Sequence, residues 1–248
     1  MTPILLIPAR LAATRLPGKP LADIGGLPMI VRVVRQAEAS GVGPVAVAAG
    51  DPEIVAAVEA AGGRAVLTDP DLPSGSDRIL AALRILDPDG RHDVVINLQG
   101  DIPFIAPEAI QACAGLLSER PEADISTVMV AESDPSDRVN PDMPKVVAAM
   151  APDGRSARAL YFTRSILYGE GPVWIHHGIY GYRRQALERF TAAPPSPLER
   201  RERLEQLRAL ELGMTLWSAV LDEAPISVDN PSDLERARAH ARRMGDPA

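Results

Sequence analysis

Short runs of β-branched and aliphatic residues alternate with helical patterns along almost the whole chain. The expected strands cover residues 4–7, 45–48, 64–67, 94–98, 125–130, 145–148, 178–182 and 215–218. Strands that alternate with helices are joined by crossover connections, which give a mostly parallel sheet with helices on both faces. The sequence therefore predicts a Rossmann-like α/β fold of three layers, with its ligand site at the carboxyl ends of the strands.

The intervening helices are expected over residues 29–38, 52–61, 77–86, 107–118, 183–191, 198–212 and 231–243. Proline stands at the expected first turn of several of them, where its missing N–H costs nothing. The helix over 198–212 carries Glu199, Glu202 and Gln206 on one face, and such a charged face is typically solvated.

Length and charge limit the classes of protein to which the chain can belong. With 248 residues and 46% hydrophobic content, we expect a single domain over 1–248. The net charge of −7 gives no basic excess for a nucleic-acid partner. Neither a membrane span nor a secretory signal is indicated, because the apolar runs are too short. We therefore expect a cytoplasmic protein.

Cysteine and lysine are both scarce. The one cysteine, Cys113, falls in the apolar pattern of a helix, which favours a buried structural thiol over a reactive one. Among 26 basic residues only Lys19 and Lys145 are lysine. Because an ammonium is a compact point donor and a guanidinium is a planar fork, both lysines are site candidates.

A cationic loop follows the first strand. It carries Arg10, Arg15 and Lys19 within ten residues, a concentration of charge that can neutralise a triphosphate. The alternative is a solvated basic loop. The chain has neither G-x-x-x-x-G-K-[S/T] nor G-x-G-x-x-G after a strand, which argues against a P-loop NTPase and a classical Rossmann dehydrogenase.

Two aspartates lie at junctions where a ligand site would form. Asp101 follows the fourth expected strand, and Asp229 precedes the last expected helix. If they meet, the pair can hold Mg²⁺, which prefers carboxylates together with substrate phosphates. The alternatives are a simple turn at Asp101 and a helix cap at Asp229.

A third candidate for ligand binding lies at the start of the helix expected from residue 77. Ser74 and Arg78 stand there, where free N–H groups and small residues can surround a ligand. Ordinary capping by Ser76 is the alternative.

Together these motifs resemble the 3-deoxy-D-manno-octulosonate (Kdo) cytidylyltransferases. The likeness rests on Pro8-Ala9-Arg10, Leu16-Pro17-Gly18-Lys19-Pro20, the Ser-Gly-x-x-Arg element and Gln99-Gly100-Asp101, and it continues in Gly178-Ile179-Tyr180-Gly181-Tyr182 and Leu204-Glu205-Gln206-Leu207-Arg208. It spans nearly the whole chain and implies the nucleotidyltransferase version of the three-layer fold.

The resemblance implies Mg²⁺-dependent CMP transfer from CTP to the anomeric hydroxyl of Kdo, giving CMP-Kdo and pyrophosphate for lipopolysaccharide synthesis. The catalytic residues would be Arg10, Lys19, Asp101 and Asp229, the last two binding the metal. CTP would contact Arg10, Arg15, Lys19, Ser74, Arg78 and Gln99. Kdo would contact Gln99, Arg164, His176, Tyr180, Glu205 and Gln206. A homodimer is also implied, with a dimerisation segment around 150–180.

The match has departures. Ile102 stands where the family usually has an acidic residue, Ala13 replaces a usual serine, and Ala49-Gly50 replaces a usual Thr-Asp. Two other functions therefore remain open. One is CMP transfer to another acidic sugar, such as an 8-substituted Kdo or a sialic-type nonulosonate. The other is a nucleotide-binding protein that has lost catalysis.

Overall fold

The computed structural model describes residues 1–12, 16–132, 134–167 and 169–245. By its internal contacts the chain divides into two compact units. The first unit comprises Thr2–Ile110 and Pro225–Ala248, and the second comprises Gln111–Ala224 together with Met1. The chain thus leaves the first unit and returns to it at its C-terminal end. The single domain expected over 1–248 stays a prediction.

The first unit contains the parallel sheet that the sequence predicts. Its strands are β1 (Pro3–Ala9), β4 (Val45–Ala49), β5 (Ala65–Leu67) and β6 (Val94–Asn97), in the order β5-β4-β1-β6. Every pairing among them is parallel. Their carboxyl ends therefore meet at one edge of the sheet, where ligands bind in open α/β sheets.

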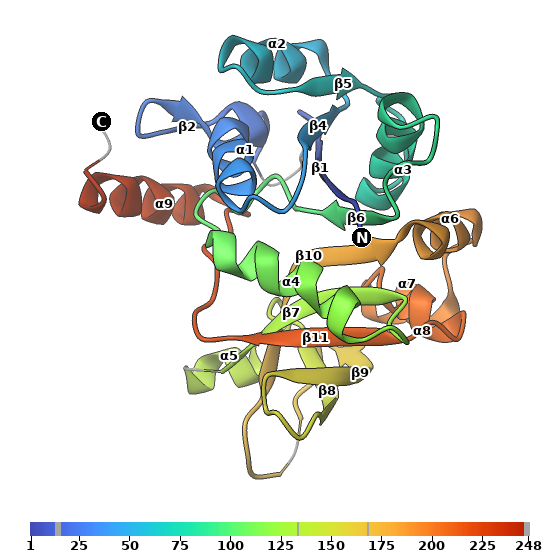
Figure 1. Cartoon of the computed structure of the whole chain (residues 1–248). Helices are drawn as coiled ribbons and strands as arrows, with labels where there is room; N and C mark the ends of the chain where they lie inside the picture. The colour runs from blue at the N-terminus through green and yellow to red at the C-terminus, as the bar shows by residue number, and fades with distance from the viewer. Residues whose placement is uncertain (13–15, 133, 168, 246–248) are drawn as a thin grey trace. The chain divides into compact units, whose positions relative to one another are not determined.

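Helices cover both faces of this sheet. They are α1 (Met29–Ala39), α2 (Pro52–Ala60), α3 (Gly75–Leu86) and α9 (Pro231–Arg243), with the start of α4 (Pro107–Glu119). Figure 1 shows α1 and α3 on either side of β1 and β4. A short 3-10 helix, η1 (Lys19–Leu21), and a hairpin of β2 (Asp23–Ile24) and β3 (Leu27–Pro28) lie between β1 and α1 in the chain. The three-layer α/β architecture is confirmed.

The second unit adds a mixed sheet. Its strands are β7 (Ile125–Ala131), β8 (Lys145–Met150), β9 (Ser156–Thr163), β10 (Trp174–Arg183) and β11 (Leu216–Leu221), in the order β10-β7-β11-β9-β8. Only β7 and β11 are parallel neighbours here. The start of β10 also pairs with β8. Strand β9 was not among the strands that the sequence predicts, because alternating exposed residues break its apolar pattern.

The helices of the second unit are α5 (Pro135–Val139), α6 (Arg184–Ala192), α7 (Pro197–Glu202) and α8 (Leu207–Glu211), with most of α4. The prediction of one helix over 198–212 is wrong. Arg203 has φ +55°, a left-handed conformation that ends α7, and α8 begins four residues later. The break turns Glu205 and Gln206 out of a regular helical face, so periodicity did not describe their environment.

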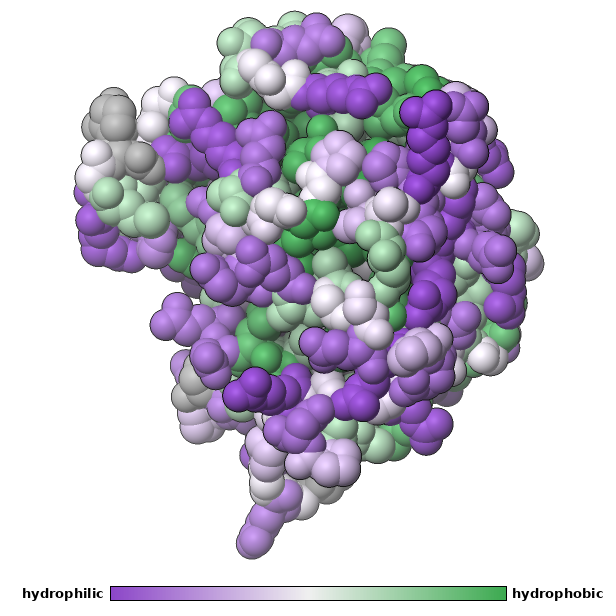
Figure 2. Space-filling model, in the orientation of Figure 1, coloured by the Kyte–Doolittle hydropathy of each residue, from purple (hydrophilic) through white to green (hydrophobic). Residues whose placement is uncertain are grey.

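Apolar side chains fill the interior of both units. In the first unit, Leu5, Leu6 and Ile7 on β1 have no exposed surface. In the second, Phe162 and Ile179 are equally buried. Hydrophilic side chains cover much of the face drawn in Figure 2, with smaller apolar areas between them. Within the described residues, no helix combines the length and apolar character that a bilayer crossing requires.

Cys113 is fully buried in α4, as the sequence predicts. Burial raises the pKa of its thiol to about 12, against a smaller opposing effect of the contact with Ser126. We expect the thiolate fraction at pH 8 to fall about a thousandfold below that of an ordinary cysteine. DTNB should therefore react with one thiol per chain in denaturant and with almost none in the native protein. Rapid reaction of the native protein would contradict this placement.

Candidate active site

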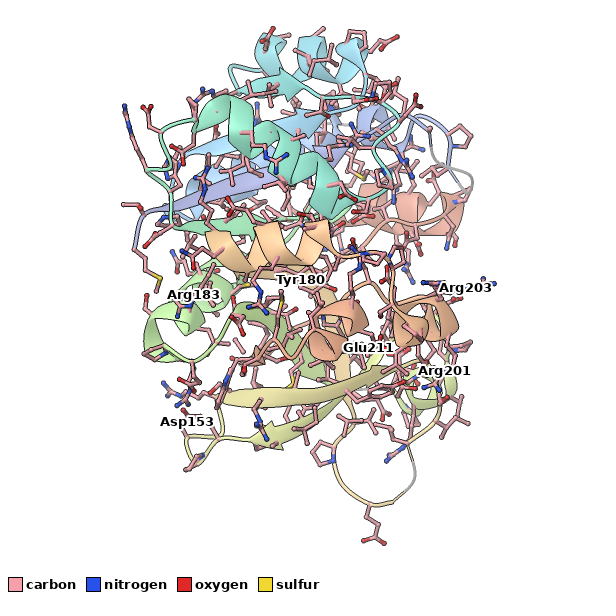
Figure 3. All side chains as sticks on the ribbon, turned by 90° about the vertical axis from the view of Figure 1, so that its right-hand side faces the viewer. Asp153, Tyr180, Arg183, Arg201, Arg203 and Glu211 are labelled. Carbon is pink, nitrogen blue, oxygen red and sulfur yellow. The ribbon has the colours of Figure 1, made fainter. Side chains whose placement is uncertain are left out.

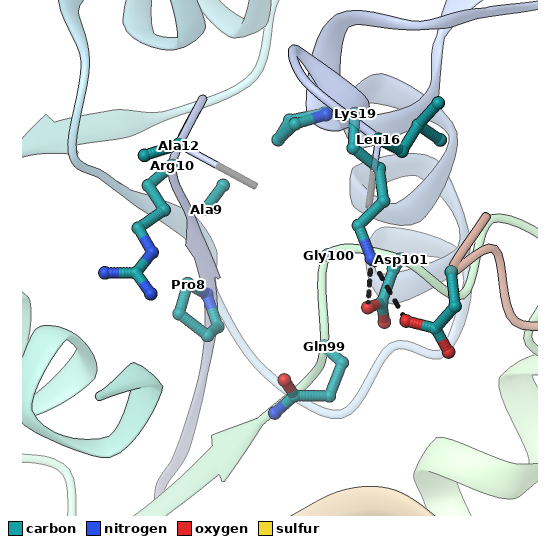
Figure 4. A pocket seen from close by; sticks show the side chains of 11 residues that line it. Pro8, Ala9, Arg10, Ala12, Leu16, Lys19, Gln99, Gly100 and Asp101 are labelled. Carbon is teal, nitrogen blue, oxygen red and sulfur yellow. Dashed lines mark hydrogen bonds and ion pairs between the residues drawn. The ribbon is translucent and has the colours of Figure 1, made fainter. Parts of the chain in front are cut away.

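A cavity of about 360 Å³ opens at the carboxyl ends of the strands in the first unit. Figure 4 shows Arg10 on one side of this cavity, with Lys19 and Asp101 on the other. Its lining comprises Pro8, Ala9, Arg10, Ala12, Leu16, Lys19, Pro20, Gln99, Gly100, Asp101 and Asp229. The cavity thus combines cations with a pair of carboxylates, as the sequence predicts.

Lys19 joins the two candidate metal ligands. Its Nζ lies 2.8 Å from Asp101 Oδ2 and 3.5 Å from Asp229 Oδ1. It also donates a hydrogen bond to Val228 O at 3.0 Å. The two aspartates are 128 positions apart in the sequence, yet both carboxylates reach one ammonium group. The predicted meeting of these side chains is therefore confirmed in the first unit.

Backbone contacts hold the two aspartates in place. The N–H of Val228 donates to the carbonyl oxygen of Asp101 at 2.9 Å, which ties the two segments together. Asn230, and not Asp229, caps α9, and it forms a capping box with Asp233. The N–H of Asp229 donates to Asp233 Oδ2 at 2.9 Å. The carboxylate of Asp229 faces Lys19 and lines the cavity, and the helix-cap alternative does not hold for this residue.

The donor set around Lys19 suits a hard divalent cation. It consists of two carboxylates and a backbone carbonyl oxygen, the ligand types that Mg²⁺ prefers. The ammonium between them shows that the position accepts positive charge. Among the described residues, no group of three or more His, Cys, Asp or Glu side chains could hold a metal ion. Substrate and water oxygens would have to complete the coordination.

A smaller cavity of about 130 Å³ adjoins the first. Pro8, Ala9, Arg10 and Gln99 line both cavities, and Ser74, Gly75, Arg78 and Leu72 complete the smaller one. Ser74 is the N-cap of α3 and accepts the N–H of Asp77. The alternative that Ser76 caps this helix is therefore wrong. Because Ser74 both caps the helix and lines the cavity, the two roles proposed for this segment coexist.

Arg78 is almost fully buried and anchors the loop after β5. Its guanidinium donates to Thr68 Oγ1 at 2.7 Å and to the carbonyl oxygens of Asp69 and Pro70 at 3.0 and 3.1 Å. Burial and the nearby Arg10 lower its pKa. A Cβ at Gly50 would lie 2.8 Å from Arg78 Nη1. The glycine that departs from the family pattern thus leaves room for this guanidinium.

The cationic loop is fixed by an interaction that the sequence did not reveal. Asp51 Oδ2 accepts the N–H of Leu11 at 2.7 Å, so the residue after the Ala49-Gly50 departure supports the loop next to Arg10. The Gln99 side chain donates to Asn97 Oδ1 at 3.2 Å. Arg15 and Ala13, which the sequence analysis also singled out, lie outside the described residues.

Apart from Gln99, the residues proposed to contact the acceptor sugar lie in the second unit. His176 on β10 is buried, and its Nε2 lies 2.9 Å from Thr127 Oγ1. Burial lowers the pKa of His176 to about 3 and that of His177 to about 4. Burial also raises the pKa of Tyr180 well above its ordinary value. These three side chains are uncharged at neutral pH, and Figure 3 shows Tyr180 among the side chains that surround it.

Glu205 and Gln206 lie in the turn between α7 and α8. Arg208 holds this turn through two short bonds to Glu199, with Nε–Oε2 at 2.8 Å and Nη2–Oε1 at 2.6 Å. Its Nη2 also lies 3.7 Å from Glu205 Oε1. Gln206 is 6% exposed, and its Nε2 has no hydrogen-bond partner among the described residues. A buried amide without a partner is costly, so Gln206 is a good candidate for binding a ligand.

The fork between Glu199 and Arg208 replaces the solvated helix face expected from the sequence. Arg208 is buried, and its guanidinium packs over the Phe190 ring at 4.6 Å from the centroid. By contrast, Arg201 and Arg203 project outward (Figure 3) and are exposed. Helical spacing over residues 198–212 could not distinguish the buried Arg208 from the exposed Arg201 and Arg203, because the chain leaves helical geometry at Arg203.

Arg164 and Lys145 serve the backbone of the second unit. Arg164 Nε donates to Glu202 O at 2.9 Å, and its Nη1 donates to Pro141 O at 2.7 Å. Lys145 has no exposed surface and donates to Asn140 O at 2.5 Å. Burial lowers the pKa of Lys145. The two cations therefore hold consecutive carbonyl groups, and the contact proposed between Arg164 and the sugar would be additional to these bonds.

Known proteins are similar to this chain over most of its length. Residues 4–216 match the cytidylyltransferase family model. A 3-deoxy-manno-octulosonate cytidylyltransferase of Parvibaculum lavamentivorans is 57% identical over 97% of this chain and 93% of its own length. One from Methylobacterium sp. (strain 4-46) is 57% identical over 98% of both chains.

Solved structures extend the comparison to the fold. A CMP:2-keto-3-deoxy-manno-octonic acid synthetase complexed with CTP superimposes with a TM-score of 0.90 at 35% identity, covering 98% of this chain and 100% of its own. A 4-diphosphocytidyl-2C-methyl-D-erythritol synthase from Anaerococcus prevotii, at 12% identity and a TM-score of 0.66, shares the fold alone. The chain therefore belongs to the cytidylyltransferase family, among the 3-deoxy-manno-octulosonate cytidylyltransferases.

Proposed function

We propose that this protein transfers CMP from CTP to the anomeric 2-hydroxyl of Kdo and releases pyrophosphate. The observation that carries the proposal is the meeting of Asp101, Asp229 and Lys19 in one cavity at the carboxyl ends of the parallel strands. The similar structure that contains CTP supports the choice of nucleotide, and the names of the curated relatives support the choice of sugar.

The reaction is a displacement at the α-phosphorus of CTP. The anomeric oxygen of Kdo forms a bond to this phosphorus, the bond to the bridging oxygen breaks, and pyrophosphate leaves with the electron pair. The proton of the hydroxyl passes to solvent. Arg10 and Lys19 line the cavity where the phosphates would lie, and their charges stabilise the leaving group. No side chain of the protein forms a covalent bond with the substrate.

Asp101 and Asp229 are the residues that would hold magnesium. When bound, magnesium supplies Lewis-acid stabilisation of the charge that develops on the phosphate and the attacking hydroxyl. In the ligand-free chain, Lys19 neutralises the two carboxylates instead. We infer that Lys19 exchanges its carboxylate partners for phosphate oxygens when the divalent cation binds. Its flexible four-carbon stem makes this change of partner possible.

The proposed acceptor contacts are Gln99 in the first unit and Arg164, His176, Tyr180, Glu205 and Gln206 in the second. Their chemistry suits a polyhydroxylated acid, because amide, imidazole, phenol and carboxylate groups can bind hydroxyls while the guanidinium of Arg164 can bind a carboxylate. A role in lipopolysaccharide synthesis, a cytoplasmic location and a homodimer with an interface around 150–180 are further parts of the proposal. They rest on the family resemblance.

The proposed activity can be tested by measuring pyrophosphate after incubation with CTP, MgCl₂ and a panel of acidic sugars. We expect release with Kdo and much less with an 8-substituted Kdo or a sialic-type nonulosonate. Asp101→Asn should lower kcat by about a hundredfold or more, because an uncharged amide is a weak metal ligand. Its thermal melting curve and circular dichroism should stay close to those of the wild type.

Three results would contradict the proposal or a part of it. Release only with another sugar would assign the protein to a different CMP transferase. Binding of CTP without release in the presence of any sugar would favour the nucleotide-binding protein that has lost catalysis. Full activity of Asp101→Asn would remove the metal role of this residue.

The exchange proposed for Lys19 can be tested without turnover. Lys19→Met removes the ammonium that neutralises Asp101 and Asp229. Because a divalent cation then no longer competes with this ammonium, it should bind the nucleotide-free protein more tightly. Partly buried ion pairs are worth about 1 kcal/mol, which corresponds to an affinity about fivefold higher. Mn²⁺ titrations followed by electron paramagnetic resonance measure this affinity directly. CTP should bind the same variant more weakly.

A matched control is Arg91→Met, which removes one positive charge from an exposed ion pair with Asp89 in the same unit. It should leave the affinity for Mn²⁺ unchanged, since its charge is screened by solvent. Asp101→Asn should weaken Mn²⁺ binding. Equal or weaker Mn²⁺ binding by Lys19→Met would show that the ammonium and the cation do not share a position.

A further inference from the structure

A bulge in β10 gathers polar groups around one hydroxyl of the second unit. Strand β10 pairs with β7 in regular antiparallel register until His177, and the register shifts before Tyr180. The Thr127 hydroxyl on β7 faces this irregularity. Its Oγ1 lies 2.7 Å from Ile179 O, 3.4 Å from His177 O and 2.9 Å from His176 Nε2. Thr127 itself has no exposed surface.

The single proton of this hydroxyl has one best position. Carbonyl oxygens only accept hydrogen bonds, and the carbonyl of Ile179 is the nearer of the two. The Thr127 proton therefore points to Ile179 O, which leaves the hydroxyl oxygen as an acceptor toward His176. A ring nitrogen that faces an acceptor must carry a proton, so Nε2 of His176 is the N–H nitrogen.

The remaining nitrogen of the ring then has a defined role. Burial lowers the pKa of His176 to about 3, so the ring is neutral and carries only one N–H. Nδ1 consequently presents a lone pair. The ring lies against Phe162 and Tyr180, with centroid separations of 5.0 and 5.4 Å, and its backbone N–H donates to Pro144 O. Contacts on several sides thus fix both the position of the ring and its tautomer.

We propose that Thr127 is a positioning residue for the acceptor sugar, because it fixes His176 as the Nε2–H tautomer and so makes Nδ1 a hydrogen-bond acceptor. Nδ1 of His176 then accepts a hydrogen bond from a sugar hydroxyl and cannot donate one to a carboxylate or carbonyl oxygen. The carboxylate of the sugar must therefore accept its hydrogen bonds from residues other than His176. This inference rests on the proposed function, in which His176 contacts Kdo.

The tautomer is tested first on the ligand-free protein at pH 7. Long-range ¹H–¹⁵N correlation spectra distinguish a protonated from an unprotonated ring nitrogen, and the signals of His176 are assigned by comparison with His176→Asn. We expect Nε2 protonated and Nδ1 unprotonated in the wild type. In Thr127→Val the acceptor is lost, and the ring signals should shift toward the other tautomer. A wild-type ring protonated at Nδ1 overturns the proposal.

Steady-state kinetics test the consequence for the sugar. Thr127→Val should raise the KM for Kdo about tenfold, the usual cost of one misdirected hydrogen bond. The KM for CTP should change less than about twofold, because the phosphate-binding candidates lie in the first unit. Thr127→Ser keeps the hydroxyl and should restore both the spectrum and the KM.

Ser126→Ala separates positioning from stability. Ser126 is a buried neighbour on β7 whose hydroxyl donates to Cys113 O at 2.6 Å, so this variant also loses a buried hydrogen bond. We expect it to lower the melting temperature much as Thr127→Val does, with no change in the KM for Kdo or in the His176 signals. Equal effects of both variants on that KM would reduce Thr127 to a structural residue and overturn the proposal.

Failure of the proposed function gives a different pattern. If the wild type releases no pyrophosphate with Kdo, the assignment of the substrate is wrong, and the role of Thr127 toward that sugar falls with it. The spectra still decide whether Thr127 fixes the tautomer. If the wild type is active and Thr127→Val changes the spectra without changing the KM for Kdo, only the positioning role is overturned.

Discussion

The ammonium of Lys19 contacts two parts of the chain that lie far from it and from each other in the sequence. It contacts Asp101 after β6, Asp229 before α9 and the carbonyl group of Val228. Without a cation at this position, two carboxylates would face each other in a cavity where water screens them only in part. Positive charge at this position, from lysine or from a metal ion, therefore stabilises the approach of the segment before α9 to the chain that follows β6.

The parallel sheet explains why these groups come together. The carboxyl ends of β1, β4 and β6 meet at one edge of the sheet, so the residues that follow each strand lie close together. Gly100 packs there against the chain that leaves β1: a Cβ would lie 3.1 Å from Pro8 O. This glycine thus leaves room for the neighbouring strand β1, and Gln99 and Asp101 on either side of it lie near the cationic loop.

Sequence patterns predicted what depends on local periodicity. They gave the parallel strands of the first unit and the positions of Lys19, Asp101 and Asp229 at strand and helix ends. They could not give contacts that depend on irregular backbone. The left-handed Arg203 breaks an expected helix, and the bulge before Tyr180 exposes carbonyl groups to Thr127. Pairings such as Asp51 with Leu11 and Glu199 with Arg208 join residues 40 and nine positions apart, with no signal in the spacing.

The two units differ in the charge and exposure of the side chains proposed to bind the substrates. The charge on the phosphates changes during the proposed reaction. The charged side chains of the first unit that line the cavity, such as Arg10 and the carboxylate partners of Lys19, keep contact with solvent. A sugar is distinguished by the directions of its hydroxyl groups. In our proposal the sugar meets buried, uncharged groups of the second unit such as His176, whose hydrogen position is set by Thr127. A sugar whose hydroxyl group points in another direction would leave a buried group of the protein without its hydrogen bond. The free-energy cost of that loss is a strong basis for specificity.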